Sequence, residues 1–307
     1  MWMNAMAELA IFSAPKPFSD PHIATIQRNA IRSWAGIGPW IDVFLIGDED
    51  GVAENAAELG VGHLPDVRRS EQGTPQVDSM IELARAASDA PALMLLNADI
   101  IVMPNVVGVV KGVRHFHEDY LLAGRRHDLD VDEELSFHIG YEFALKERVA
   151  AEGKLAGWNA CDYFIFPRHL YTEVPAFSIG RAGWDNWMLY HAIGAPWPAI
   201  DVTKQLMVVH QNHDYAHLPG GKPHYQHPET DINIQAAGSM RNMRTLLDVP
   251  YELREWRVRR KGFSLLRFLH AIENALQPDE RVGSGLRWRA LLLVRRWQKA
   301  LIARGAD

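Results

Sequence analysis

Cysteine is nearly absent from the sequence, and its long apolar runs are all interrupted. Cys161 is the single cysteine among 307 residues, which excludes an intramolecular disulfide and a cysteine-rich zinc site. The longest apolar stretch, residues 90–110, is broken by polar residues such as Asn97 and Asp99, whereas a bilayer helix needs about 20 mostly apolar residues. Residues 1–9 do not resemble a signal peptide. These absences predict a soluble cytoplasmic protein, or one bound peripherally at the inner face of the membrane.

Positive charge is scarce in most of the chain and concentrated at its end. Residues 1–250 hold 19 Lys and Arg against 32 Asp and Glu, whereas residues 251–307 hold 13 against 6. The net charge of −6 therefore combines an acidic region of −13 with a basic segment of +7. The acidic region makes nucleic acid an unsuitable main partner.

Strand and helix patterns alternate over the first 110 residues. We expect short apolar strands at 9–13, 41–46 and 92–96 and amphipathic helices at 22–34, 52–59 and 77–87. This alternation predicts a mostly parallel sheet flanked by helices, in which ligands bind beyond the carboxyl ends of the strands.

The remainder of the chain is less regular. We expect strands at 120–123 and 162–166 and a helix at 185–193. Residues 203–230 are interpreted as mostly loop, although His210 follows an apolar pair with the character of a late strand. From residue 251 onward the chain is predicted to be basic and helical.

Asp99 lies within the apolar stretch 93–102. An unpaired buried carboxylate costs several kcal/mol, so this side chain requires a partner, a hydrogen bond or a metal ion. Mg²⁺ and Mn²⁺ prefer oxygen ligands and bridge phosphate groups. The alternative is that Asp99 caps a turn, and the spacing alone leaves both interpretations open.

Several short motifs together resemble the GT-A glycosyltransferases, the nucleotide-diphospho-sugar transferase superfamily, over roughly residues 8–215. In chain order these motifs are Ser13 to Pro17 after the first strand, Gly47-Asp48, Gly73-Thr74-Pro75 before a helix with Asp78, Asn97-Ala98-Asp99, and Gly183-Trp184-Asp185-Asn186. Asn97 departs from the family pattern, because it replaces the first aspartate of the Asp-x-Asp motif. The resemblance implies a GT-A, Rossmann-like fold with a mixed, mostly parallel sheet, followed by a C-terminal helical extension.

The resemblance also implies a binding site for a nucleotide-diphosphate sugar. The residues that it places there are Ser13, Pro15, Lys16, Asp48, Thr74, Asp78, Asn97, Ala98, Asp99 and Asp162. Asp99 would hold a divalent metal, Mn²⁺ or Mg²⁺, with His210 as a further ligand in preference to His213. Ordinary structural roles stay open for Lys16 (solvated loop), Asp48 (turn), Thr74 (helix start) and Asp162 (buried ion pair).

Asp185 is the candidate catalytic base that would take a proton from an acceptor hydroxyl. Trp184 and Trp187 would offer flat apolar surfaces to an acceptor sugar. Near a helix start an aspartate also serves as a cap, and tryptophan is common in cores, so these alternatives remain.

The C-terminal residues form an amphipathic pattern. Its apolar side contains Leu286, Ala290, Leu293, Val294, Trp297, Ala300 and Leu301, and its basic side contains Arg287, Arg289, Arg295, Arg296 and Lys299. Such a helix binds an anionic membrane surface or packs on the domain.

The resulting hypothesis is a glycosyltransferase with a catalytic domain at 1–250 and a basic extension at 251–307. Within the domain, residues 1–110 would bind the nucleotide and 111–250 the acceptor, a hydroxyl on a glycan or glycolipid. One rival is a sugar nucleotidyltransferase, although the loop 13–17 lacks the glycines that such enzymes use. The other rival is a non-catalytic nucleotide- or glycan-binding protein, which Asn97 favours.

Overall fold

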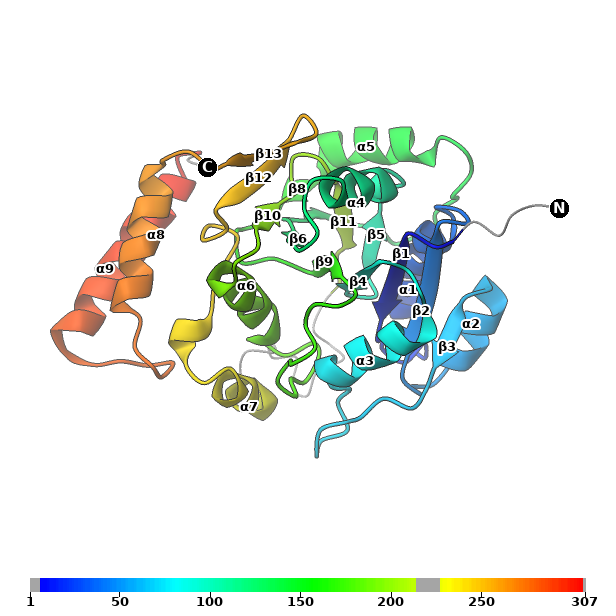
Figure 1. Ribbon diagram of the computed structural model, residues 1–307, viewed down its shortest axis with the longest axis horizontal. Helices are drawn as coiled ribbons and strands as arrows, with labels where there is room; N and C mark the ends of the chain where they lie inside the picture. The colour runs from blue at the N-terminus through cyan, green and yellow to red at the C-terminus, as the bar shows by residue number, and fades with distance from the viewer. Residues whose placement is uncertain (1–5, 214–226, 306–307) are drawn as a thin grey trace.

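A nine-stranded sheet forms the centre of the protein (Figure 1). The structure is a computed structural model that describes residues 6–213 and 227–305. In spatial order the strands are β13 (Arg257–Arg260), β12 (Tyr251–Arg254), β10 (Ala199–Asp201), β6 (Leu121–Ala123), β9 (Tyr163–Pro167), β4 (Ala92–Leu96), β1 (Leu9–Ser13), β2 (Ile41–Ile46) and β3 (Gly62–Leu64). Neighbours are parallel, except that β9 is antiparallel to both β6 and β4, and β13 to β12.

A smaller four-stranded sheet lies beside the central one. Its strands, in spatial order, are β5 (Ile100–Val102), β11 (Val208–Gln211), β7 (His127–Leu129) and β8 (Lys154–Leu155). The helices of the described residues are α1 (Pro21–Ala35), α2 (Val52–Leu59), α3 (Val77–Ala87), α4 (Val106–Arg114), α5 (Tyr141–Glu152), α6 (Trp184–Gly194), α7 (Pro228–Ala236), α8 (Leu265–Leu276), α9 (Gly285–Ile302) and the 3₁₀ helix η3 (Met240–Asn242).

The central strands are buried on both faces, as continuous apolar runs require. Side chains alternate along β1, so that Leu9 and Ile11 pack with Trp34 of α1 into one core. Ala10 and Phe12 pack with α3 and α6 into a second core on the opposite face. All five residues of β1 are buried, which is typical of parallel strands covered by helices on both sides. The predicted fold class, a mostly parallel sheet flanked by helices, is confirmed.

The prediction that the chain is helical from residue 251 onward is wrong for residues 251–260. These residues form the β12–β13 hairpin, and β12 joins the central sheet beside β10. Glu255 and Trp256 at its turn have φ values of 51° and 62°, which is the two-residue turn geometry of tight hairpins. Helical structure begins at Leu265, and α8 and α9 form a hairpin at one end of the molecule (Figure 1).

The interpretation of residues 203–230 as mostly loop is also incomplete. Strand β11 occupies 208–211 within this range, and α7 begins at Pro228. The histidines at 217 and 224 lie outside the described residues. No described helix is both long enough and apolar enough to cross a bilayer.

Candidate functional site

A cleft of about 620 Å³ lies at the carboxyl edge of the central strands. The parallel strands β1 and β4 end at this edge. Because β9 is antiparallel, it begins here, with Tyr163 opposite Leu96. The loop after β1, the turn after β4, the residues before β9 and the start of α6 therefore all line the cleft. This is the edge at which the sequence predicts a ligand site.

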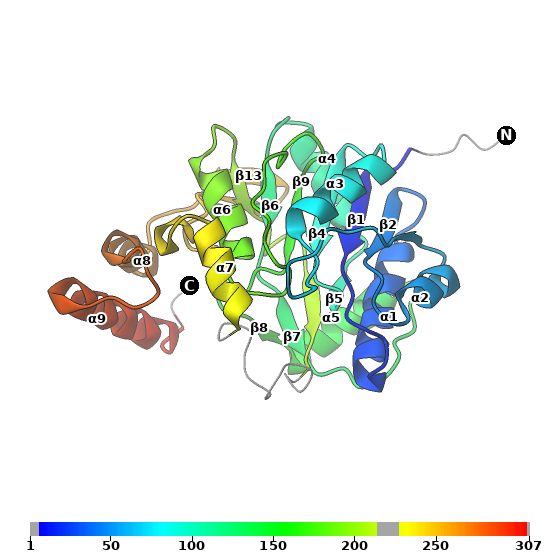
Figure 2. The same ribbon diagram turned by 90° about the horizontal axis from the view of Figure 1, so that it is seen from below.

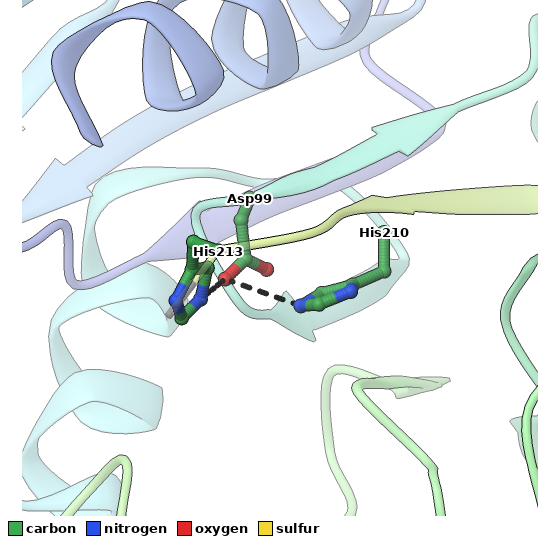
Figure 3. A group of neighbouring side chains, drawn as sticks. All are labelled: Asp99, His210 and His213. Carbon is green, nitrogen blue, oxygen red and sulfur yellow. Dashed lines mark hydrogen bonds and ion pairs between the residues drawn. The ribbon is translucent and has the colours of Figure 1, made fainter. Parts of the chain in front are cut away.

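Asp99 and two histidines meet at the floor of the cleft (Figure 3). Asp99 lies in the turn between β4 and β5, and β11 pairs with β5 so that His210 is opposite Ile100. The Asp99 Oδ2 atom is 3.2 Å from His213 Nε2 and 3.8 Å from His210 Nε2. The sequence prefers His210 as the second ligand, and the structure brings both histidines to Asp99.

These three side chains fit a divalent cation. Their ligand atoms all lie within 4.8 Å of one another. The Asp99 Oδ1 atom is buried and has no hydrogen-bond partner among residues 6–213 and 227–305. Burial opposes ionisation, but His210, His213 and Lys16 hold the pKa of Asp99 well below its usual range. A charged carboxylate with an unused oxygen beside two imidazoles is a set of ligands that Mn²⁺ and related ions accept.

A chain of charged side chains holds His210 in place. Its Nδ1 atom is 3.2 Å from Asp128 Oδ1, and Asp128 receives a 2.8 Å hydrogen bond from Arg126 Nε. Arg126 also forms an ion pair with Asp162. A carboxylate on the far nitrogen of a ligating histidine fixes the ring orientation. The sequence does not single out Arg126 or Asp128.

Asn97 and Asp162 form a second pair on the cleft wall. Asn97 Nδ2 donates a 2.8 Å hydrogen bond to Asp162 Oδ1, and the Asn97 backbone N–H donates to the Asp162 carbonyl. An aspartate at position 97 would place a second carboxylate against Asp162. The Asn97 amide instead donates to the Asp162 carboxylate, so an asparagine suits this position.

The loop after β1 also lines the cleft, so Ser13, Pro15 and Lys16 lie there, with Lys16 Nζ 3.5 Å from His213 Nε2. The Ser13 Oγ donates to the Leu96 carbonyl at 2.7 Å, which joins the ends of β1 and β4. Gln27 pins the backbone of Lys16 through two hydrogen bonds. Burial lowers the pKa of Lys16, while Asp99 opposes that shift. Lys16 is half-buried in the cleft lining, so it is not a fully solvated loop lysine.

The other nucleotide-site predictions divide between cleft and surface. Thr74 and Ala98 line the cleft, whereas Asp48 and Asp78 do not belong to its lining. Asp48 is exposed and forms an ion pair with Arg69, and Asp78 forms one with Arg68 at 2.7 Å. The structure therefore does not bring these two carboxylates to the cleft.

Asp185 lies in the cleft wall at the start of α6. Gly183 is the N-cap of this helix, and no side chain caps it. Burial raises the pKa of Asp185 to about 6, although backbone N–H groups at the helix start oppose the shift and Asp162 adds to it. A carboxyl group with this pKa accepts a proton near neutral pH.

The two predicted acceptor-binding tryptophans differ in position. Trp184 lines the cleft and packs edge-on against Phe164. Trp187 lies outside the cleft lining, where it stacks on His191 at a centroid distance of 5.0 Å and contacts Phe177. Trp187 packs into the core, so the structure does not bring it to the cleft.

Glu229 is a further residue that the sequence does not single out, and it supports the cleft from behind its lining. It lies in the first turn of α7 with its side chain 0% exposed. Its carboxylate accepts hydrogen bonds from Ser70 (2.5 Å), Thr74 (2.8 Å), Ser178 (2.9 Å) and Arg181 (3.0 Å). Burial opposes its ionisation, but the three hydroxyl groups and Arg181 lower its pKa. Glu229 thus fixes Thr74 and Arg181 where they line the cleft.

Replacing Glu229 with alanine should destabilise the protein by roughly 3 kcal/mol, because the buried hydroxyls lose their acceptor. Glu229→Gln keeps the shape and part of the hydrogen bonding, so we expect a smaller loss. Urea unfolding measures both changes, with Glu280→Ala, at an exposed position, as the control. If Glu229→Ala changed the free energy of unfolding as little as Glu280→Ala does, Glu229 would not be the buried acceptor that supports the cleft.

No protein-family model matches the sequence, and neither does any curated protein. Solved structures do match. A Mycobacterium tuberculosis glucosyl-3-phosphoglycerate synthase with Mn²⁺, UDP and glucosyl-3-phosphoglycerate matches at 12% identity and TM-score 0.45, over 84% of this chain and 88% of that one. The same synthase with Mn²⁺, UDP-glucose and phosphoglyceric acid matches at 13% and 0.46, over 75% and 78%. A mycobacterial protein matches at 15% and 0.44, over 70% and 71%. At these TM-scores the likeness assigns no reaction to this chain.

Proposed function

We propose that this protein is a metal-assisted GT-A glycosyltransferase. It moves a sugar from a nucleotide-diphosphate donor to a hydroxyl group on a glycan or glycolipid. The observation that carries the proposal is Asp99, a buried, charged carboxylate with an unused oxygen that meets two histidines in the cleft. The resemblance of the cleft motifs to GT-A enzymes supplies the reaction class.

The donor diphosphate would lie between Asp99 and the loop after β1. Asp99, His210 and His213 would hold the cation, which as a Lewis acid neutralises the charge that develops on the leaving diphosphate. Lys16 and Arg181 both line the cleft. Their positive charges would also attract the donor diphosphate. Thr74 and the backbone of the 13–16 loop would contact the nucleotide.

Asp185 would accept the proton of the acceptor hydroxyl as that oxygen attacks the anomeric carbon of the donor. Trp184, in the same wall of the cleft, would form the apolar surface beneath the acceptor. Asp162 and Asn97 would contact hydroxyls of the donor sugar, since both line the cleft and hold each other in place.

Neither rival function has an observation in its favour. A nucleotidyltransferase would need backbone space for phosphates after β1, but that loop contains two prolines and no glycine. Asn97 favoured a non-catalytic binding protein, because it replaces an aspartate of the family motif. Its hydrogen bond to Asp162 gives a structural reason for the asparagine. A panel of nucleotide sugars distinguishes the three functions. A glycosyltransferase would transfer the sugar, a nucleotidyltransferase would exchange pyrophosphate, and a binding protein would bind the nucleotide sugar without turnover.

Transfer should depend on the metal and prefer Mn²⁺ over Mg²⁺. Two imidazole ligands suit Mn²⁺ better than Mg²⁺, which prefers oxygen, so we expect roughly tenfold more activity with Mn²⁺ at equal concentration. Donor turnover after dialysis against EDTA and re-addition of each ion is the measurement. Full activity in EDTA, or a preference for Mg²⁺, would contradict the ligand set.

A further inference from the structure

The α8–α9 hairpin is joined to the rest of the protein through α8 and through the segment that connects the two helices. His270 Nε2 is 2.9 Å from Asp248 Oδ2, and Asn274 donates to the other Asp248 oxygen at 2.5 Å. Arg267 donates to the Leu247 carbonyl at 3.1 Å. These contacts hold α8 against the body, whereas α9 packs chiefly on α8, and the hairpin stands out from the molecule (Figure 2).

The inner face of α9 is the one that touches α8. Leu291, Val294 and Gln298 are buried there, and Arg295 donates to Glu273 of α8 at 2.6 Å. The pattern of the sequence placed Val294 on the same apolar side as Leu293 and Trp297. In the structure these residues separate, because Val294 is covered by α8 while the other two are exposed.

Both helices carry an apolar stripe that no described residue covers. On α9, Leu286, Leu293 and Trp297 are 83%, 45% and 52% exposed, and their spacing of seven and four residues places them on one side. On α8, Leu265 and Phe268 are 52% and 51% exposed, with a spacing of three. Monomeric proteins rarely leave extended apolar surface uncovered without a partner.

Helix geometry places the two stripes on the same side of the hairpin. The helices run antiparallel, because residues 277–284 connect them and they pack along each other as a hairpin. Arg295 of α9 contacts Glu273 of α8, and Arg287 contacts Ala275. An α-helix turns by 100° per residue, so these contacts determine which side of each helix faces the other helix. Both stripes then face away from the side where α8 meets Asp248. Phe263, 85% exposed and in ring contact with Phe268, extends this surface.

The charge beside the stripes identifies the partner. Helix α9 has five basic residues and no acidic residue, and Arg289 and Arg296 are exposed along the border of its stripe. A second copy docked on this face would bring the same positive charges together. An anionic lipid surface supplies both the opposite charge and an apolar layer for the leucines and Trp297.

We propose that the α8–α9 hairpin binds an anionic lipid bilayer through this apolar surface, with the flanking arginines among the headgroups. The chain would then lie peripherally on the membrane, without spanning it. Access to a lipid-linked acceptor is the one part of this inference that rests on the proposed glycosyltransferase activity; the membrane binding itself does not.

Co-sedimentation of the full chain with vesicles tests the proposal. We expect binding to phosphatidylglycerol–phosphatidylcholine vesicles, at least tenfold weaker binding to phosphatidylcholine alone, and release by salt. The double variant Leu293→Gln, Trp297→Gln should lose at least tenfold in binding. The matched control is Leu292→Gln, since Leu292 is 39% exposed but lies about 100° from the Leu293 position on the helix.

Thermal unfolding and donor turnover in solution should be unchanged in both variants, which separates this test from that of the proposed reaction. Equal binding by the double variant and the wild type would overturn the proposal. So would an absence of vesicle binding by the wild type. Dimers that only the double variant abolishes, without any lipid binding, would assign the surface to a second copy instead.

Discussion

Asp99→Ala should lower metal-dependent sugar transfer by a factor of about 1,000 or more. The substitution removes the only carboxylate of the Asp99–His210–His213 group. The variant would therefore lose the metal that neutralises the charge developing on the leaving diphosphate. The fold should persist, because the backbone carbonyl of Asp99, which accepts from Gln211, is kept. Donor turnover in Mn²⁺, measured alongside the thermal unfolding temperature, checks both statements.

Asp119→Ala is the matched control for this variant. Asp119 is a surface carboxylate whose partner is His169, and its removal also changes the net charge by one. We expect its activity to equal that of the wild type. If Asp99→Ala retained normal turnover, the assignment of the metal site to Asp99 would be wrong, even though the fold would be unaffected.

Asp185→Asn should reduce transfer by about 100-fold or more, because the acceptor proton loses its base. In the wild type, activity should rise with pH through about 6, the pKa to which burial raises Asp185. Below that pH the carboxyl group is protonated and cannot accept a proton. In Asp185→Asn the rise in activity between acidic and neutral pH should disappear. A fully active variant with an unchanged profile would show that Asp185 has only a structural role.

Asp185→Asn should lower the activity but not the stability of the protein. A raised folded-state pKa means that the folded protein favours the protonated carboxyl. The stabilisation present below the unfolded pKa is therefore lost as pH rises towards about 6. Asparagine avoids that loss, so Asp185→Asn should unfold at the same temperature as the wild type or higher at pH 7. Differential scanning calorimetry at pH 5 and pH 7 measures this difference.

The sequence predicts those parts of the fold and site whose signal is local. The strands β1 and β4 are continuous apolar runs and β2 is mostly apolar, so the burial of β1 and β4 and the edge at which all three end could be deduced directly. Asp99 is recognisable because a charged residue among buried neighbours needs a partner. Its place directly after the strand at 92–96 puts it at the carboxyl edge of the sheet, although the spacing alone leaves open whether it binds a metal or caps a turn.

Other features depend on contacts between distant parts of the chain and have no local signal. Glu229 reaches Thr74, a residue 155 positions away, from a helix of ordinary composition. Asp48 and Asp78 have the expected place in the sequence order, but Arg69 binds the exposed Asp48 and Arg68 binds the half-buried Asp78 outside the cleft lining. The β12–β13 hairpin turns at Glu255-Trp256, which lacks the Asn-Gly or Asp-Gly pair that marks such turns.

The most direct test of the central claim is a calorimetric titration of nucleoside diphosphates into the protein with Mn²⁺ and with EDTA. If Asp99, His210 and His213 hold a cation that bridges a diphosphate, at least one of UDP, GDP, ADP or CDP should bind with micromolar affinity in Mn²⁺. The same nucleotide should bind at least tenfold more weakly in EDTA, and to Asp99→Ala under either condition. Binding that is equal with and without Mn²⁺, or no binding by any of the four, would contradict the account.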